Sequence, residues 1–111
     1  MAGFNGTLGI RPGDDATSVV LDTRPEHEVG PGFVHFAVLG TVAEVAAAGA
    51  AGSPVVPAQI SLSLLSPAKS GRLVGRGRVI RRGKRLIVAE GEVFQDDTLV
   101  AKAVVTFAVI G

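Results

Sequence analysis

The chain has 111 residues, a length that supports one compact domain and excludes a second independent one. Its 47% hydrophobic residues and formal net charge of +1 exclude a disordered chain. Because it has no cysteine, it has no disulfide framework, no thiolate nucleophile and no cysteine-based zinc site. We expect a single domain over residues 1–111 and, since neither a signal peptide nor a membrane span is visible, a cytoplasmic location.

The first half of the sequence predicts two short strands followed by one helix. Gly6–Arg11 and Ala16–Thr23 are separated by four turn residues that include a proline and a glycine. Between Phe36 and Gly49 the chain has no proline, many alanines and apolar residues on every side. A helix that is apolar all round is a buried helix. We therefore expect this segment in the interior, ended by the glycines and proline that follow it.

The second half predicts four longer strands joined by tight turns. Polar and apolar residues alternate along each of them: Val55–Leu65, Leu73–Arg82, Arg85–Gln95 and Leu99–Val109. The tripeptide Arg82-Gly83-Lys84 predicts a hairpin turn. This order of elements predicts an α+β domain in which a curved antiparallel sheet of about six strands wraps around one central helix.

Glu44 is the most informative residue, because it is the only formally charged side chain between His35 and Lys69. A buried carboxylate without a partner is costly, or else it binds a proton. The same burial raises the pKa of a carboxyl group toward the range of a general base. Two interpretations stay open: a catalytic carboxylate, or a side chain that faces solvent or caps backbone groups.

His35 stands immediately before the predicted helix, nine residues ahead of Glu44. The unpaired amides at a helix N-terminus, here those of Phe36 and Ala37, can hold an oxyanion. Together with a carboxylate that activates water, such amides favour hydrolysis of a thioester or an ester. Taken alone, His35 is more typical of a capping or packing residue, and His27 of a solvated side chain in a charged loop.

Three segments resemble hotdog-fold acyl-CoA thioesterases, most closely the relatives of the phenylacetate-pathway and 4-hydroxybenzoyl-CoA thioesterases. The spacing from His35 to Glu44, with Gly32 upstream, is similar to the family's His-Gly-Gly…Asp/Glu segment. The stretch Leu64–Gly71 is similar to its Tyr-x-Ser-Pro-Ala-Lys-x-Gly strand end, and Arg82-Gly83-Lys84 to its hairpin. The resemblance extends over most of the chain and implies the hotdog fold.

The resemblance also implies a homodimer or homotetramer in which the strand after the helix, Val55–Leu65, pairs with a second copy. A strand without any charge makes a poor solvent-exposed edge, which favours the same pairing. The active site implied by the family lies at the dimer interface. There Glu44 is the base or nucleophile, the Phe36 and Ala37 amides polarise the thioester carbonyl, and His35 supports the loop.

Eight basic residues and no acid lie between Lys69 and Arg85. Basic groups suit the phosphates of coenzyme A, which enters as part of the substrate and not as a cofactor. By position, the resemblance nominates these residues for substrate binding: Ser66, Lys69, Arg82, Gly83, Lys84 and Arg85. Arg76 is instead expected to pair across strands with Glu90 or Glu92. Nucleic acid is disfavoured as a partner because no tryptophan or tyrosine is present to stack on bases, and no metal-binding spacing is visible.

Two departures from the family's pattern keep a second function open. Phe36-Ala37 stands where the family has two glycines, so side chains occupy space that the thioester usually approaches. Val29 stands where an asparagine is frequent. The sequence therefore predicts an acyl-CoA thioesterase, with a non-catalytic or weakly active acyl-CoA-binding protein as the alternative.

Overall fold

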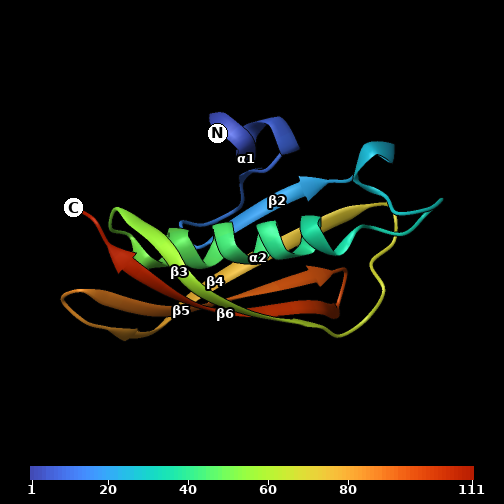
Figure 1. Cartoon of the computed structure of the whole chain (residues 1–111). Helices are drawn as coiled ribbons and strands as arrows, with labels where there is room; N and C mark the ends of the chain where they lie inside the picture. Colours follow the sequence, from blue (N-terminus) through green and yellow to red (C-terminus); the bar gives the residue numbers. More distant parts are fainter.

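The computed structural model describes residues 1–111, which form two α-helices, one short 3-10 helix and six strands. Their order is α1 (Gly3–Leu8), β1 (Arg11–Pro12), β2 (Ser18–Asp22), η1 (Pro25–His27), α2 (Phe36–Ala51), β3 (Val55–Leu64), β4 (Arg72–Arg82), β5 (Leu86–Gln95) and β6 (Thr98–Val109). The strands form one antiparallel sheet in the order β1-β2-β4-β5-β6-β3. Figure 1 shows this sheet curving around α2. The α+β prediction is confirmed, and the arrangement is the hotdog fold.

The strands beneath α2 carry glycines that let the helix lie very close to the sheet. A Cβ atom built on Gly91 would lie 1.9 Å from the carbonyl oxygen of Ala43, and one on Gly77 would lie 2.0 Å from that of Ala46. Any side chain at these two positions would push the helix away from the sheet. Gly77 and Gly91 therefore set how closely α2 packs on the sheet.

Most predicted elements are confirmed. The helix begins at Phe36 as expected and continues to Ala51, where Gly52 ends it with a φ of 68°. The strand predicted over Ala16–Thr23 forms β2, and the four later strands and their two hairpin turns are found within one or two residues of the expected bounds. Neither helix is long and apolar enough to cross a membrane.

The strand predicted over Gly6–Arg11 is wrong, because the first half of that segment belongs to α1 and only Arg11 lies in a strand, β1. The Arg24 guanidinium donates hydrogen bonds of 3.1 and 3.2 Å to the carbonyl oxygens of Thr7 and Leu8. These carbonyls end the helix and would otherwise lack partners. A contact from far along the chain thus stabilises a helix that the local pattern does not indicate.

β3 is an edge strand that pairs on one side only, with β6. None of its ten residues is charged. Ile60 and Leu64 lie opposite the buried residues Val105 and Ala101, so they are on the helix side of the sheet, yet they remain 44% and 54% exposed. The chain therefore presents an unpaired, uncharged strand edge with apolar side chains beside it.

Ion pairs cover the other face of the sheet, although the predicted pairing of Arg76 with Glu90 or Glu92 is wrong, because Arg76 forms its ion pair with Asp15 at 3.6 Å. Arg76 lies opposite Glu92, and Arg78 lies opposite Glu90. Glu90 is buried beneath Arg78 and Lys102, and its carboxylate accepts a hydrogen bond of 2.9 Å from Arg78 Nε. Burial alone would raise the pKa of Glu90, but the hydrogen bonds with Arg78 and Lys102 lower the pKa overall. Arg78, Lys102, Glu90 and Glu92 therefore pair with one another within the sheet.

Candidate functional site

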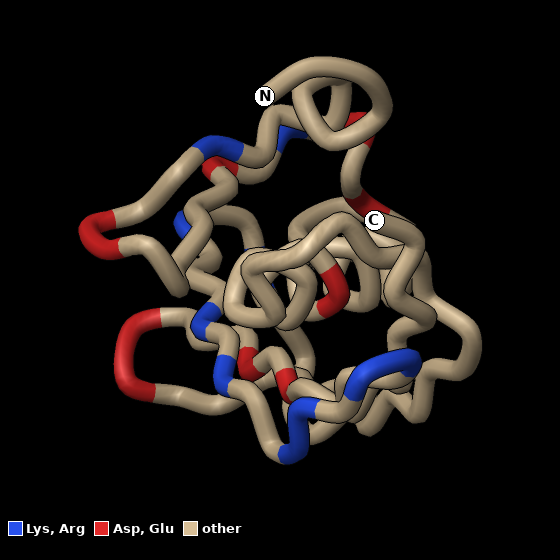
Figure 2. The backbone as a smooth tube through the Cα atoms, turned by 90° about the vertical axis from the view of Figure 1, so that its left-hand side faces the viewer, with Lys and Arg blue, Asp and Glu red and all other residues tan.

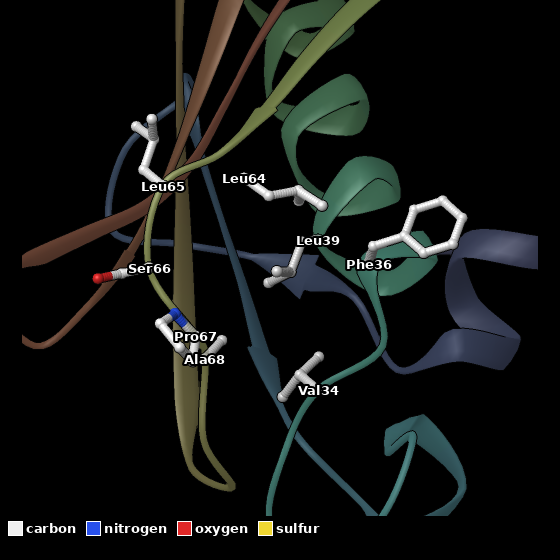
Figure 3. A pocket seen from close by; sticks show the side chains of 8 residues that line it. All are labelled: Val34, Phe36, Leu39, Leu64, Leu65, Ser66, Pro67 and Ala68. Carbon is white, nitrogen blue, oxygen red and sulfur yellow. The ribbon is translucent and has the colours of Figure 1, made fainter.

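An apolar pocket of about 330 Å³ opens beside the N-terminal end of α2. Its lining residues are Val34, Phe36, Leu39, Leu64, Leu65, Ser66, Pro67 and Ala68. In Figure 3 the side chains of Val34, Leu39 and Leu64 point toward one another, whereas the hydroxyl group of Ser66 points away from them. The pocket therefore combines the start of the predicted helix with the Ser-Pro-Ala-Lys segment, as the resemblance implies.

The N-terminus of α2 offers one unoccupied amide instead of two. His35 caps the helix, since its Nδ1 atom accepts a hydrogen bond of 3.0 Å from the Ala37 amide. The Val38 and Leu39 amides both donate to the His35 carbonyl oxygen. The Phe36 amide, at the first helical position, makes no such bond. The capping interpretation of His35 is thus confirmed, and Phe36 is the predicted polariser whose amide is available to a ligand.

Glu28 ties together the two loops beside the pocket. Its carboxylate accepts hydrogen bonds from the Ser70 hydroxyl at 2.6 Å and from the Gly32 amide at 2.8 Å. The hydrogen bond from Ser70, followed by that from Gly32, lowers the pKa of Glu28. The Val34 amide also donates to the Ala68 carbonyl oxygen at 2.9 Å. No local pattern in the sequence indicates the contacts of Glu28 with Ser70 and of Val34 with Ala68, because each joins segments more than 30 residues apart.

The interpretation of His27 as a solvated side chain is wrong, because this histidine is 3% exposed. Its Nδ1 atom accepts a hydrogen bond of 3.0 Å from the Arg24 amide, and its carbonyl oxygen accepts one of 2.9 Å from the His35 amide. The short helix η1, which begins at Pro25, turns the imidazole inward. His27 therefore supports the segment that leads into α2, although charged neighbours surround it in the sequence.

Glu44 lies on the least buried stripe of α2, which it shares at helical spacing with Ala37, Thr41 and Ala48. The carboxyl group is half-buried, and burial raises its pKa, with no charged or hydrogen-bonding partner contributing. The interpretation of Glu44 as a group that caps the backbone is therefore not supported. Along the helix, Glu44 lies about 12 Å from Phe36. One chain does not bring this carboxyl group to its own free amide.

Ser66 and Lys69 do lie together, in a polar pocket of about 270 Å³ next to the apolar one. Gln95 holds this segment in place. Its side-chain oxygen accepts a hydrogen bond of 2.8 Å from the Lys69 amide, and its side-chain nitrogen donates one of 2.6 Å to the Lys69 carbonyl oxygen. The Lys69 side chain itself stays exposed, so its charge is available to a ligand.

The predicted hairpin residues lie at the opposite end of the sheet. Gly83 and Arg85 line a pocket of about 350 Å³ at the tip of the β4–β5 hairpin. Arg82 turns inward and donates a hydrogen bond of 2.8 Å to the carbonyl oxygen of Ala51 at the end of α2. Figure 2 looks onto the end of the molecule from which this hairpin projects, where Lys and Arg segments outnumber acidic ones on the near strands.

The predicted substrate-binding residues therefore form two groups within one chain. β4 runs from Arg72 to Arg82, and a strand of this length separates Lys69 from the hairpin tip by roughly 35 Å. No group of three or more His, Asp or Glu side chains is arranged to hold a metal ion. What one chain presents is an apolar pocket with one free amide, a half-buried carboxyl group further along the helix, and a distant basic hairpin.

A family model described as the thioesterase superfamily matches residues 31–102, a segment that contains His35, Glu44 and the Ser-Pro-Ala-Lys stretch. The chain therefore belongs to the thioesterase superfamily. At the level of the family it is a thioester hydrolase. Among curated proteins, none matches the chain significantly.

Solved structures confirm the resemblance. A phenylacetic acid degradation-related protein from Ralstonia eutropha is 33% identical, with a TM-score of 0.80, and the match covers 95% of this chain and 88% of that one. A mutant of the phenylacetic acid degradation protein PaaI from Thermus thermophilus is 23% identical, with a TM-score of 0.86 and coverage of 96% and 98%. A Bacillus halodurans protein, whose crystal structure contains CoA, is 22% identical, with a TM-score of 0.84 and coverage of 96% and 74%. The latter two matches show that the fold is shared.

Proposed function

We propose that this protein hydrolyses acyl-CoA thioesters at a site formed by two copies of the chain. The single observation that carries the proposal is the unpartnered, half-buried carboxyl group of Glu44, about 12 Å along the helix from the free amide of Phe36. A thioesterase needs both groups at one carbonyl. A second copy can supply the missing partner, and the CoA in the Bacillus halodurans neighbour supports the substrate class.

The free edge of β3 supports this pairing. Two copies that pair β3 antiparallel about a two-fold axis place the Leu64 end of one strand beside the Val55 end of the other. Val56 pairs with Ala108 on β6, and Ala108 pairs in turn with Leu86 at the hairpin tip. Leu86 therefore lies two strand spacings, or about 10 Å, from Val56. The hairpin of one copy therefore approaches the apolar pocket of the other. Such an arrangement unites the two groups of predicted substrate-binding residues.

In the proposed reaction, the Glu44 carboxylate of one copy removes a proton from water, and the water oxygen attacks the thioester carbonyl carbon. The negative charge that develops on the carbonyl oxygen is stabilised by the Phe36 amide and the positive end of α2 in the other copy. Collapse of the tetrahedral intermediate breaks the carbon–sulfur bond. The CoA thiolate leaves and takes up the proton from Glu44, and the acyl group leaves as a carboxylic acid.

The occupied Ala37 amide favours a second candidate function, that of an acyl-CoA-binding protein with little or no turnover. With His35 bound to Ala37, only Phe36 is left to donate to the carbonyl oxygen. The loss of one donor from such a site typically costs about 100-fold or more in rate. This alternative predicts measurable binding of CoA thioesters together with negligible hydrolysis.

Hydrolysis of a panel of short, aromatic and long acyl-CoAs tests the proposal. For the best substrate, Glu44→Gln is expected to lower kcat by about 100-fold or more, the usual contribution of a positioned general base. Glu92→Gln is the matched control, because this acid lies on the other face of the sheet next to Lys102. Unchanged kcat in Glu44→Gln would contradict the proposed role, and binding without hydrolysis of any panel member would establish the alternative.

A further inference from the structure

We infer that Glu28 is a positioning residue of the proposed reaction, which fixes the start of α2 relative to Lys69. The inference rests on the proposed function and adds a residue to it. Glu28 lines neither the apolar pocket nor the polar pocket beside it. Its carboxylate therefore acts through two groups that are proposed to contact the substrate, the free amide of Phe36 and the side chain of Lys69.

Glu28 closes a ring of three hydrogen bonds between two segments that are far apart in the sequence. Its Oε1 atom accepts a hydrogen bond of 2.8 Å from the Gly32 amide, and its Oε2 atom accepts one of 2.6 Å from the Ser70 hydroxyl. The Ser70 amide donates in turn to the Gly32 carbonyl oxygen at 3.3 Å. Hydrogen bonds to an ionised acceptor are the stronger ones. Loss of the carboxylate therefore leaves only the longest bond of the ring.

The turn that precedes α2 depends on hydrogen bonds because side chains do not pack around it. Gly30 and Gly32 have φ angles of 127° and 85°, and no atom beyond the adjacent residues lies within 4 Å of a Cβ atom built on either. Two of the bonds that attach this turn to the Ser-Pro-Ala-Lys segment are those of Ser70 to Glu28 and to Gly32. Phe36 follows Gly32 by four residues, so a displaced turn displaces the free amide.

Lys69 precedes Ser70, and two side chains hold this part of the chain. Gln95 forms hydrogen bonds of 2.8 and 2.6 Å with the Lys69 backbone, and Glu28 binds the Ser70 hydroxyl. Of these two side chains, only that of Glu28 also contacts the turn before α2. A substrate that contacts both Lys69 and the Phe36 amide requires them at a fixed separation, and the Glu28 carboxylate supplies that link.

The ring requires two hydrogen-bonding atoms at position 28 and not a negative charge. No Lys or Arg side chain forms an ion pair with Glu28. In Glu28→Gln, the side-chain oxygen can accept from the Gly32 amide and the side-chain nitrogen can donate to the Ser70 oxygen, since a hydroxyl group also accepts. Glu28→Ala removes both bonds. The two variants therefore separate hydrogen bonding from charge.

Steady-state hydrolysis of the best panel substrate tests the inference. Glu28→Ala is expected to lower kcat/KM by about 10-fold to 100-fold, a loss that a displacement of about 1 Å can cause. Glu28→Gln is expected to retain most of the wild-type value. Glu26→Ala is the matched control, because it removes a nearby carboxylate whose ion pair is with Arg24, and it should leave kcat/KM unchanged.

Two further measurements separate positioning from a general loss of stability. Ser70→Ala breaks the same bond from an exposed residue, so its effect and that of Glu28→Ala should not multiply in the double variant. In the protein without ligand, exchange of the bonded Val34 and His35 amides should be faster in Glu28→Ala and unchanged in Glu28→Gln. A residue that only stabilises the fold would also accelerate the slowest amides of β5 and β6.

Wild-type kcat/KM in Glu28→Ala would overturn the inference, as would a Glu28→Gln variant that is impaired as much as Glu28→Ala. Where Glu28→Ala fails to fold, Ser70→Ala decides, and wild-type activity in that variant would overturn the inference equally. If the wild type hydrolyses no panel member, the proposed function fails on its own. Equilibrium binding of the same intact thioesters then tests Glu28: the Glu28→Ala variant is expected to bind them about 10-fold more weakly, and equal binding would overturn the inference.

Discussion

The two ends of α2 lie in chemically opposite surroundings. At its N-terminal end, the adjoining pocket is lined without any charged side chain, and one backbone amide remains free. At its C-terminal end, Arg82 binds the last carbonyl group, and the hairpin adds Arg81, Lys84 and Arg85 with no acid among them. A ligand that matches both ends has an apolar part near a carbonyl group and an anionic part far from it.

The distance between these ends is the reason for proposing a site shared by two copies. Sixteen helical residues span about 24 Å, and the carboxyl group of Glu44 lies between the ends with no partner. A second copy in the opposite orientation would place a basic hairpin and a carboxylate beside each apolar pocket. The contrast between the two ends is therefore a physical argument for a shared site, independent of any relative.

The largest expected effect is on the free energy of unfolding, and it comes from a substitution that displaces the whole of α2, and with it both ends of the helix, from the sheet. Gly91→Ala places a methyl group against the Ala43 carbonyl oxygen, where 1.9 Å is available. Lifting α2 from the sheet is expected to lower the free energy of unfolding by about 3 kcal/mol, the upper range for overpacking a core. Urea denaturation followed by circular dichroism measures the loss.

Gly49→Ala is the matched control for this substitution, because Gly49 belongs to α2 but is exposed, and a Cβ atom added there would lie 3.9 Å from its nearest neighbour. Replacing an unhindered helical glycine by alanine is expected to raise the free energy of unfolding by up to about 1 kcal/mol. A loss below about 1 kcal/mol in Gly91→Ala would show that the helix is free to shift, and that its two ends are not held at a fixed separation.

Most of the fold could be predicted from the sequence because its elements carry strong local signals. The uninterrupted apolar stretch from Phe36 predicts the buried helix, and the alternation from Val55 onward predicts the sheet. The helix Gly3–Leu8 could not be predicted, since it depends on Arg24, which follows it by 16 residues or more. Tertiary contacts of this kind leave no periodic signal.

The site could be predicted only in part. Spacing identifies Glu44 and His35, but which amides remain free depends on the side-chain conformation of His35. The contacts of Glu28 with Ser70 and the burial of His27 follow from loop geometry that no sequence pattern records. The wide separation of Lys69 from the hairpin likewise emerges only once the length of β4 is known.

An intermediate effect is expected from neutralising the basic end. The double substitution Lys84→Gln and Arg85→Gln is expected to raise KM for an acyl-CoA about 10-fold at low salt while leaving kcat nearly unchanged, because two of the proposed contacts with phosphate would be lost. At 1 M salt, where the Debye length is about 3 Å, the difference should largely disappear. Steady-state hydrolysis at two salt concentrations measures both effects, and Arg82 is left intact because it caps α2.

Two comparisons sharpen this result. The double substitution Arg11→Gln and Arg76→Gln removes the same charge from exposed positions on β1 and β4 and should leave KM unchanged. An N-acetylcysteamine thioester, which lacks the phosphates of CoA, should be hydrolysed equally by the wild type and the hairpin variant. An equal rise in KM for both thioesters would mean that the hairpin acts on the shape of the site and not on the phosphates.

The smallest expected effect concerns stability, at the carboxyl group between the two ends. Burial raises the pKa of Glu44, so the fold disfavours its ionised form. At neutral pH this ionisation destabilises the wild type, and Glu44→Gln is expected to be more stable by up to about 0.5 kcal/mol. Below about pH 4, where a glutamate is protonated in both the folded and unfolded states, the difference should vanish.

Urea denaturation of the wild type and Glu44→Gln at both pH values measures this difference, with Glu92→Gln as a control that is expected to give no gain because it removes a carboxylate near Lys102. A less stable Glu44→Gln at neutral pH would mean that the carboxylate has a stabilising partner and is not poised to accept a proton from water.

The gain in stability of Glu44→Gln should also increase with protein concentration, because pairing of two copies across β3 removes further water from Glu44 in the proposed site. A group that lowers stability and yet is required for turnover is typical of a catalytic residue, and it separates a catalytic role for Glu44 from a structural one.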